Sequence, residues 1–65
     1  MQFQIDNMGC GGCARSITTT IQAHDPAAQV MIDLPAKRVT VTTQADVTAI
    51  EQALLQAGFP PQRIA

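Results

Sequence analysis

The hydrophobic residues of this chain change their spacing several times within 65 residues, and this alternation constrains the fold more than any other feature. In residues 2–6 every second side chain is apolar, which is typical of a half-buried strand. A glycine-rich loop follows, and from Cys13 or Ala14 onwards the apolar residues recur at helical spacing. Asp25-Pro26 ends this predicted helix near His24, because the residue before a proline is disfavoured in the α conformation. The first part of the chain therefore predicts a strand and then a helix.

The middle of the chain returns to the spacing of a strand. Val30 and Ile32 stand two residues apart before the segment Leu34-Pro35-Ala36-Lys37, and Val39 and Val41 stand two residues apart after it. Two β-branched segments around a short turn that contains proline predict a β-hairpin.

A second helix is predicted after Asp46, which we interpret as its N-cap residue. One face of this helix is apolar, and it carries Val47, Ile50, Ala53, Leu54 and Ala57. Gly58 stands where a glycine commonly ends a helix. The tail from residue 59 to residue 64 contains Pro60-Pro61, so we predict only a short edge strand there.

The predicted order of elements is strand, helix, strand, strand, helix and strand, and it fills a single domain over residues 1–65. This order is that of the ferredoxin-like βαββαβ sandwich. We therefore predict an α+β fold, in which a four-stranded antiparallel sheet carries two helices on one of its faces.

The composition argues against several classes of partner. Hydrophobic residues make up 46% of the chain and charged residues 14%, which favours a folded module over a disordered one. Four cations oppose five anions without a basic patch, and Trp and Tyr are absent, so we expect neither nucleic acid nor a membrane surface as a partner. No apolar run approaches the ~20 residues of a membrane span, and the N-terminus lacks the pattern of a secretory signal. We expect a cytoplasmic protein that does not insert into a membrane.

Cys10 and Cys13 are the residues best able to carry chemistry, and they lie between a predicted strand and the start of a predicted helix. A helix N-terminus favours the thiolate form, and the intervening Gly11-Gly12 lets both sulfur atoms turn toward one point. Soft thiolates select Cu(I), with Zn(II), Cd(II) or Hg(II) as competing ions. A pair of ligands suits Cu(I), whereas a closed zinc site needs four. Because C-x-x-C also serves thiol–disulfide exchange, the two residues by themselves leave both chemistries open.

The segment Met8-Gly9-Cys10-Gly11-Gly12-Cys13 resembles the M-x-C-x-x-C motif of the heavy-metal-associated domain. That family includes small cytosolic copper chaperones and the N-terminal metal-binding domains of copper-exporting P-type ATPases. The resemblance extends over residues 1–65 and includes Ala57-Gly58-Phe59 at the end of the second predicted helix. It implies a ferredoxin-like domain that binds one Cu(I) ion through Cys10 and Cys13 and passes it to a partner by ligand exchange.

This reading also gives each cysteine a role and names a class of partner. We expect Cys10, in the loop, to be the more accessible ligand that exchanges first, and Cys13, at the helix start, to anchor the ion. The expected acceptor is a similar domain of a copper-exporting ATPase or a copper-responsive regulator. We expect a monomer that is not an enzyme, and the sequence leaves open a dimer bridged by copper.

Three positions depart from the family pattern. The family commonly has Gly where this chain has Asn7, Thr or Ser where it has Gly9, and Tyr or Lys near the metal where it has Phe59. Phe59 retains an aromatic ring without a hydroxyl group or a charge. We interpret it as a cover for the core or for the metal loop.

Two further residues are candidate ligands that we interpret as structural. Met8, at the end of the first predicted strand, is expected to fill the core beneath the loop. His24 is expected to be exposed and to interact with the C-terminus of the first predicted helix. The alternatives to a metallochaperone are a metal-binding domain of a larger heavy-metal ATPase or mercuric reductase, and a thiol–disulfide redox protein.

Overall fold

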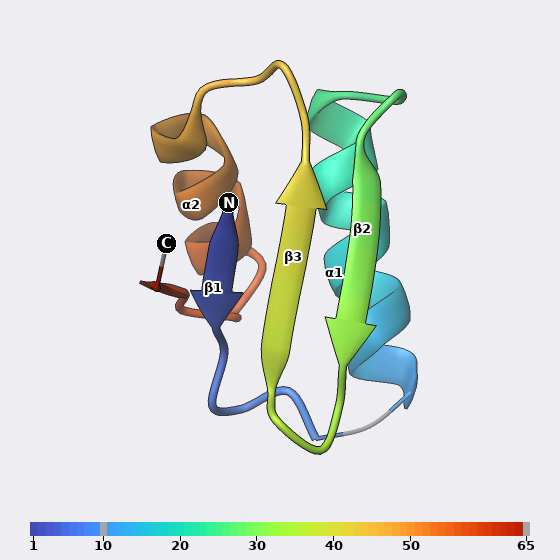
Figure 1. Cartoon of the computed structure of the whole chain (residues 1–65), viewed down its shortest axis with the longest axis vertical. Helices are drawn as coiled ribbons and strands as arrows, with labels where there is room; N and C mark the ends of the chain where they lie inside the picture. The colour runs from blue at the N-terminus through green and yellow to red at the C-terminus, as the bar shows by residue number, and fades with distance from the viewer. Residues whose placement is uncertain (10, 65) are drawn as a thin grey trace.

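One layer of sheet and one layer of helices make up the protein, as its computed structural model shows (Figure 1). The structure describes residues 1–9 and 11–64. Its elements follow the predicted order: β1 (Gln2–Gln4), α1 (Gly11–His24), β2 (Gln29–Asp33), β3 (Arg38–Thr42), α2 (Val47–Gln56) and β4 (Gln62–Arg63). The four strands have the order β2-β3-β1-β4 and pair antiparallel, and both helices cover the same face of the sheet. The prediction of an α+β, ferredoxin-like fold is confirmed.

The strand register turns the apolar residues toward the helices. Phe3 of β1 lies opposite Val39 of β3, and Val41 of β3 lies opposite Val30 of β2. Phe3 and Val39 are completely buried, whereas Val30 is half-buried because β2 forms an edge of the sheet. The alternation in the sequence therefore identified the buried face of each strand correctly.

The first strand is shorter than predicted. It ends at Gln4 instead of residue 6, because the chain turns at Ile5–Met8, where the Met8 N–H donates to the Ile5 carbonyl at 3.1 Å. The Ile5 N–H still bonds across to the Lys37 carbonyl at 2.9 Å, and the Ile5 side chain is completely buried. The Ile5 side chain is thus buried like those on the inward face of β1, although Ile5 is no longer part of the strand.

The start of α1 corrects our prediction. The helix begins at Gly11, before both Cys13 and Ala14. The first N–H groups of a helix have no partner within the helix, and each glycine costs only about 1 kcal/mol relative to alanine. Burial of Ile17 and Ile21 farther along α1 offsets this cost. The helix ends at His24, as predicted.

The end of α2 also follows the sequence, whereas its start lacks one expected bond. Asp46 occupies the N-cap position, but its side chain makes no capping hydrogen bond. At the other end Gly58 has φ +92°, its N–H bonds to the Leu55 carbonyl, and the Phe59 N–H bonds to the Leu54 carbonyl at 2.9 Å. These two bonds form a Schellman motif. The predicted apolar face holds for Ile50 and Leu54, which are buried, but not for Ala57, which is exposed beyond the last turn.

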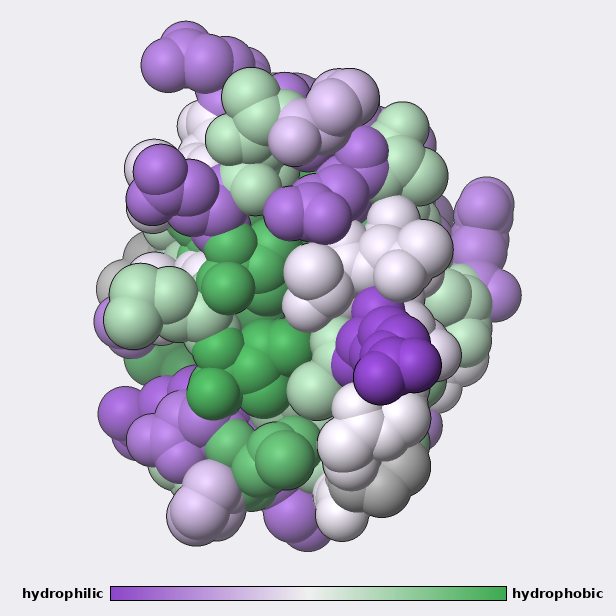
Figure 2. All heavy atoms as spheres, turned by 90° about the vertical axis from the view of Figure 1, so that its right-hand side faces the viewer, coloured by the Kyte–Doolittle hydropathy of each residue, from purple (hydrophilic) through white to green (hydrophobic). Residues whose placement is uncertain are grey.

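The core lies between the sheet and the two helices. Its buried side chains are Phe3, Ile5, Met8, Ile17, Ile21, Ala28, Val39, Val41, Ile50 and Leu54. The prolines leave β4 with only two residues, which pair with β1 at one edge of the sheet as predicted. At the opposite edge hydrophobic side chains reach the surface in a strip between β2 and α1 (Figure 2). Among the described residues, neither helix is long and apolar enough to cross a membrane.

Candidate metal centre

β1 finishes and α1 begins at the same end of the molecule (Figure 1), and Cys13 belongs to the first turn of α1. Cys13 is the third residue of α1, is half-buried and packs against the core. Gly11 and Gly12 before it are exposed. Cys10 lies outside the described residues, so its predicted role as the more accessible ligand stays a prediction.

The start of α1 favours a negatively charged ligand at Cys13. The backbone N–H groups of a first helical turn have no intrahelical partners, and the helix dipole places partial positive charge there. The first turn that starts at Gly11 contains no acidic residue. Arg15, two positions after Cys13, is exposed, and side chains two positions apart on a helix do not face each other. A helix start of this kind is a position at which proteins commonly hold a thiolate ligand.

Met8 lies beneath this loop as part of the core. Its side chain is completely buried and belongs to the same cluster as Phe3, Ile5 and Ile17. The interpretation of Met8 as a core residue is therefore confirmed. The sulfur atom fills space among apolar neighbours, which is a common role for methionine.

A second segment reaches the loop from the end of α2. The Asn7 side chain donates from Nδ2 to the Gly58 carbonyl oxygen at 2.8 Å, joining residues 51 positions apart. Phe59, the next residue, is half-buried and packs against the core, as we expected of it. Its predicted role as a cover of the metal loop concerns Cys10 and falls outside the described residues. In the sequence Asn7 stood out only as a departure from the family pattern, because no local pattern relates it to Gly58.

His24 lies at the far end of α1 from Cys13. It is the last residue of the helix and is exposed, as predicted, while its interaction with the helix C-terminus stays a prediction. Within residues 1–9 and 11–64, no three His, Cys, Asp or Glu side chains lie close enough together to hold a metal ion.

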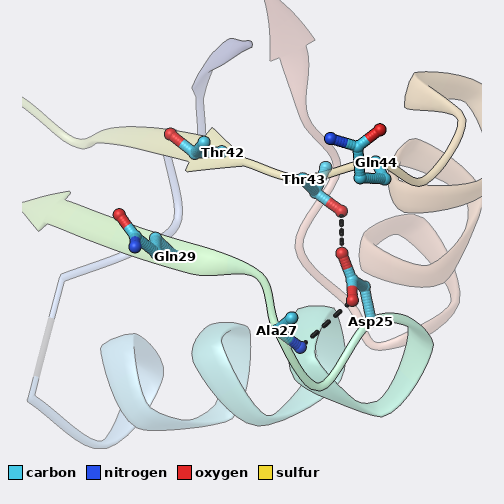
Figure 3. Close-up of a pocket in the computed structure, with 6 residues that line it drawn as sticks. All are labelled: Asp25, Ala27, Gln29, Thr42, Thr43 and Gln44. Atoms are coloured by element: carbon cyan, nitrogen blue, oxygen red, sulfur yellow. Dashed lines mark hydrogen bonds between the residues drawn. The ribbon is translucent and has the colours of Figure 1, made fainter.

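That far end also contains a shallow pocket of about 270 Å³, lined by Asp25, Ala27, Gln29, Thr42, Thr43 and Gln44 (Figure 3). The Thr43 hydroxyl donates to the Asp25 carboxylate at 2.5 Å, and the Ala27 N–H donates to it at 3.1 Å. The bond from Thr43, followed by that from Ala27, lowers the pKa of Asp25. One carboxylate oxygen thus stabilises the turn after α1, and the other joins this turn to the connection before α2, so we interpret the bonds in this pocket as structural.

The family model of the heavy-metal-associated domain matches residues 2–60. A gold-binding protein of known structure is 45% identical, with a TM-score of 0.92, and the match covers 95% of each chain. The copper chaperone Atx1 from Synechocystis PCC6803 is 29% identical, with a TM-score of 0.92, over 95% of this chain and 98% of that one.

A structure of lower sequence identity has the same fold. Oxidized MerP from Ralstonia metallidurans CH34 is 19% identical, with a TM-score of 0.83, over 94% of this chain and 89% of that one. At this identity the likeness concerns the fold alone. No curated protein matches the chain. Because the family model spans residues 2–60, from β1 to the connection before β4, this protein belongs to the heavy-metal-associated domain family.

Proposed function

We propose that this protein is a metallochaperone, which carries a Cu(I) ion between the thiolates of Cys10 and Cys13 and transfers it to a partner. The observation that carries this proposal is the position of Cys13 in the first turn of α1, half-buried and beside exposed glycines. Membership of the heavy-metal-associated family supports it, as do structural neighbours that include a copper chaperone.

The ligand chemistry favours a soft ion of low coordination number. Thiolates prefer Cu(I) over hard ions, while Zn(II), Cd(II) and Hg(II) compete for the same donors. Two thiolates and one Cu(I) ion together carry a net charge of −1. The partial positive charge at the start of α1 offsets part of this charge.

Transfer would proceed by exchange of ligands without a free ion. A thiolate of the acceptor first bonds to the metal, Cys10 then leaves, and Cys13 holds the ion until a second acceptor thiolate replaces it. The acceptor we propose is a similar domain of a copper-exporting P-type ATPase or a copper-responsive regulator in the cytoplasm. No bond of a substrate other than the metal–sulfur bonds is made or broken, so the protein is not an enzyme in this proposal.

Au(I) is a second candidate cargo. A gold-binding protein is 45% identical to this chain, a higher identity than that of the copper chaperone Atx1 at 29%. Au(I) is also a soft monovalent ion that accepts two thiolates. The same two cysteines would hold it, so the choice between the two ions is a question of relative affinity.

The test is competition of the reduced, metal-free protein for Cu(I), Au(I), Zn(II) and Hg(II) against chelators of known affinity. We expect tight binding of one Cu(I) or Au(I) ion, and its loss in Cys10→Ser and in Cys13→Ser with the circular dichroism spectrum unchanged. Ser16→Ala is the matched control, because Ser16 is exposed on the same helix and its replacement leaves both thiols in place. Binding that persists in either cysteine variant would show that the ligand pair is wrongly assigned.

A further inference from the structure

The turn before the cysteine loop is held on two sides. On one side the Ile5 N–H bonds to the Lys37 carbonyl at 2.9 Å, in the turn between β2 and β3. On the other side the Asn7 amide donates to the Gly58 carbonyl at 2.8 Å, just after α2. Between these two bonds the Met8 side chain is buried in the core. Asn7 stands three residues before Cys10 in the sequence, so its bond restrains the chain as it enters the metal loop.

The acceptor of the Asn7 bond, the Gly58 carbonyl, lies in the Schellman motif that ends α2. Gly58 adopts φ +92°, and the bonds from the Gly58 and Phe59 N–H groups back to Leu55 and Leu54 fix the direction of the chain. Phe59 then packs against the core. These bonds at the end of α2 therefore position the Gly58 carbonyl, and the Asn7 amide joins the turn before the metal-binding motif to it.

The glycines on either side of Cys10 in the sequence, Gly9 and Gly11, carry no side chain that could pack against the fold. Gly9 is exposed, and a Cβ atom added there would meet no atom within 4 Å. Gly11 has the same open surroundings. A side chain at Gly9 would therefore find no packing neighbour, and the bond from Asn7 restrains the chain two positions earlier.

We propose that Asn7 is a positioning residue for metal exchange, which holds the cysteine loop against the Gly58–Phe59 turn and so slows release of the ion to competing thiols. This proposal rests on the proposed function. Asn7 does not touch the ion in this account and acts through the placement of the loop. The amide group adds a hydrogen bond across the fold to the anchoring that the buried Met8 side chain provides.

The size of the effect follows from the strength of one exposed hydrogen bond. Its loss should accelerate local opening about fivefold, which corresponds to about 1 kcal/mol at 25 °C. Asn7 has an ordinary negative φ, since the positive φ values among the described residues are those of Lys37 and Gly58. Replacement of Asn7 therefore removes the donor without adding backbone strain.

The test uses Asn7→Ala and Asn7→Leu, the second of which retains the approximate size of the side chain without its donor. The matched control is Gln4→Ala, because the Gln4 amide also donates to a backbone carbonyl, that of Ala36, at 3.1 Å. In the metal-free protein we measure amide hydrogen exchange at Met8, whose N–H bonds within the turn. In the copper-loaded protein we measure the rate at which a thiol chelator removes Cu(I), together with the thermal midpoints.

We expect both Asn7 variants to speed hydrogen exchange at Met8 and removal of Cu(I) about fivefold. Gln4→Ala should change each of these two rates less than about twofold, although it should lower the thermal midpoint by as much as the Asn7 variants do. Faster hydrogen exchange with an unchanged rate of Cu(I) removal would overturn the positioning role. Equal acceleration by Gln4→Ala would overturn it too, since the cause would then be general stability. If the protein bound no Cu(I), the proposed function would fail, and unchanged exchange at Met8 would separately refute the tether.

Discussion

Replacement of Met8 tests whether this residue, at the start of the metal-binding motif, is a metal ligand or a core residue. Met8 is the first residue of the metal-binding motif, and its thioether could in principle coordinate Cu(I). In the structure its side chain is completely buried among the apolar residues of the core. We therefore expect Met8→Ala to reduce stability and Met8→Leu to leave both stability and metal affinity nearly unchanged.

The magnitude follows from burial. Truncation of a buried Met to Ala costs about 2–5 kcal/mol, and a domain of this size has a total stability of roughly 3–10 kcal/mol. In such a small domain each 1 kcal/mol lowers the thermal midpoint by about 4–8 °C, so a loss of 3 kcal/mol lowers it by about 12–24 °C. Met8→Leu conserves volume and should cost less than about 1.5 kcal/mol.

The assay combines thermal unfolding of the metal-free proteins with competition for Cu(I) against a chelator. Met8→Ala should show the large decrease in thermal midpoint, and Met8→Leu should bind Cu(I) with an affinity within about twofold of the parent. A Met8→Leu variant that folds normally but binds Cu(I) much more weakly would show that the sulfur is a ligand. Met8→Ala with an unchanged thermal midpoint would refute the assignment of Met8 to the core.

Three further expectations concern other parts of the fold. Gly58→Ala should lower the free energy of unfolding by about 1–2 kcal/mol through the positive φ of this position alone, because an added Cβ meets nothing within 4 Å. Gly9 has equally open surroundings without a positive φ, so Gly9→Ala should not destabilise the metal-free protein. Urea unfolding of both variants would show the difference. The bond from Thr43 lowers the pKa of Asp25, so its carboxylate stabilises the fold above its unfolded-state pKa of about 3.9 and loses this effect as the pH falls through the lower folded-state value. Thermal midpoints of the parent and of Asp25→Ala should therefore converge below about pH 4, and a constant difference down to pH 2 would contradict this. Phe59→Ala should cost less than about 3 kcal/mol, because the ring is only half-buried, while Phe59→Tyr retains the thermal midpoint; equal midpoints for the parent and Phe59→Ala would show that the ring does not pack.

Most of the architecture was predictable because side-chain periodicity and burial have the same cause. A strand on one face of a sheet needs every second residue apolar, and Val39 and Val41 of β3 meet this need and are buried. A helix on that sheet needs apolar residues three or four positions apart, and Ile17 and Ile21 of α1 supply them. Once the order of strands and helices was known, few arrangements could bury all of these faces together.

The ends of elements were less predictable, because local preference and tertiary packing compete there. Glycine disfavours a helix, yet α1 includes Gly11 and Gly12, since the remainder of the helix is held by its buried face. The alternation of β1 extends to Ile5, yet its ladder stops at Gln4, because Ile5–Met8 forms a turn. Asp46 has the right place and residue type for an N-cap, yet its side chain makes no capping bond.

The surroundings of the metal loop could not have been derived from local patterns at all. The motif locates two cysteines beside a helix start, and the position of Cys13 in α1 agrees with that expectation. The bond from Asn7 to Gly58 depends on how β1 and the end of α2 meet in space, and no periodicity relates residues 51 positions apart. In our proposal the short motif supplies the metal ligands, whereas the rate at which the ion leaves depends also on restraints supplied by the fold. Asn7 links the two contributions, because it directly precedes the metal-binding motif in the sequence and its side chain bonds to the Gly58 carbonyl after α2.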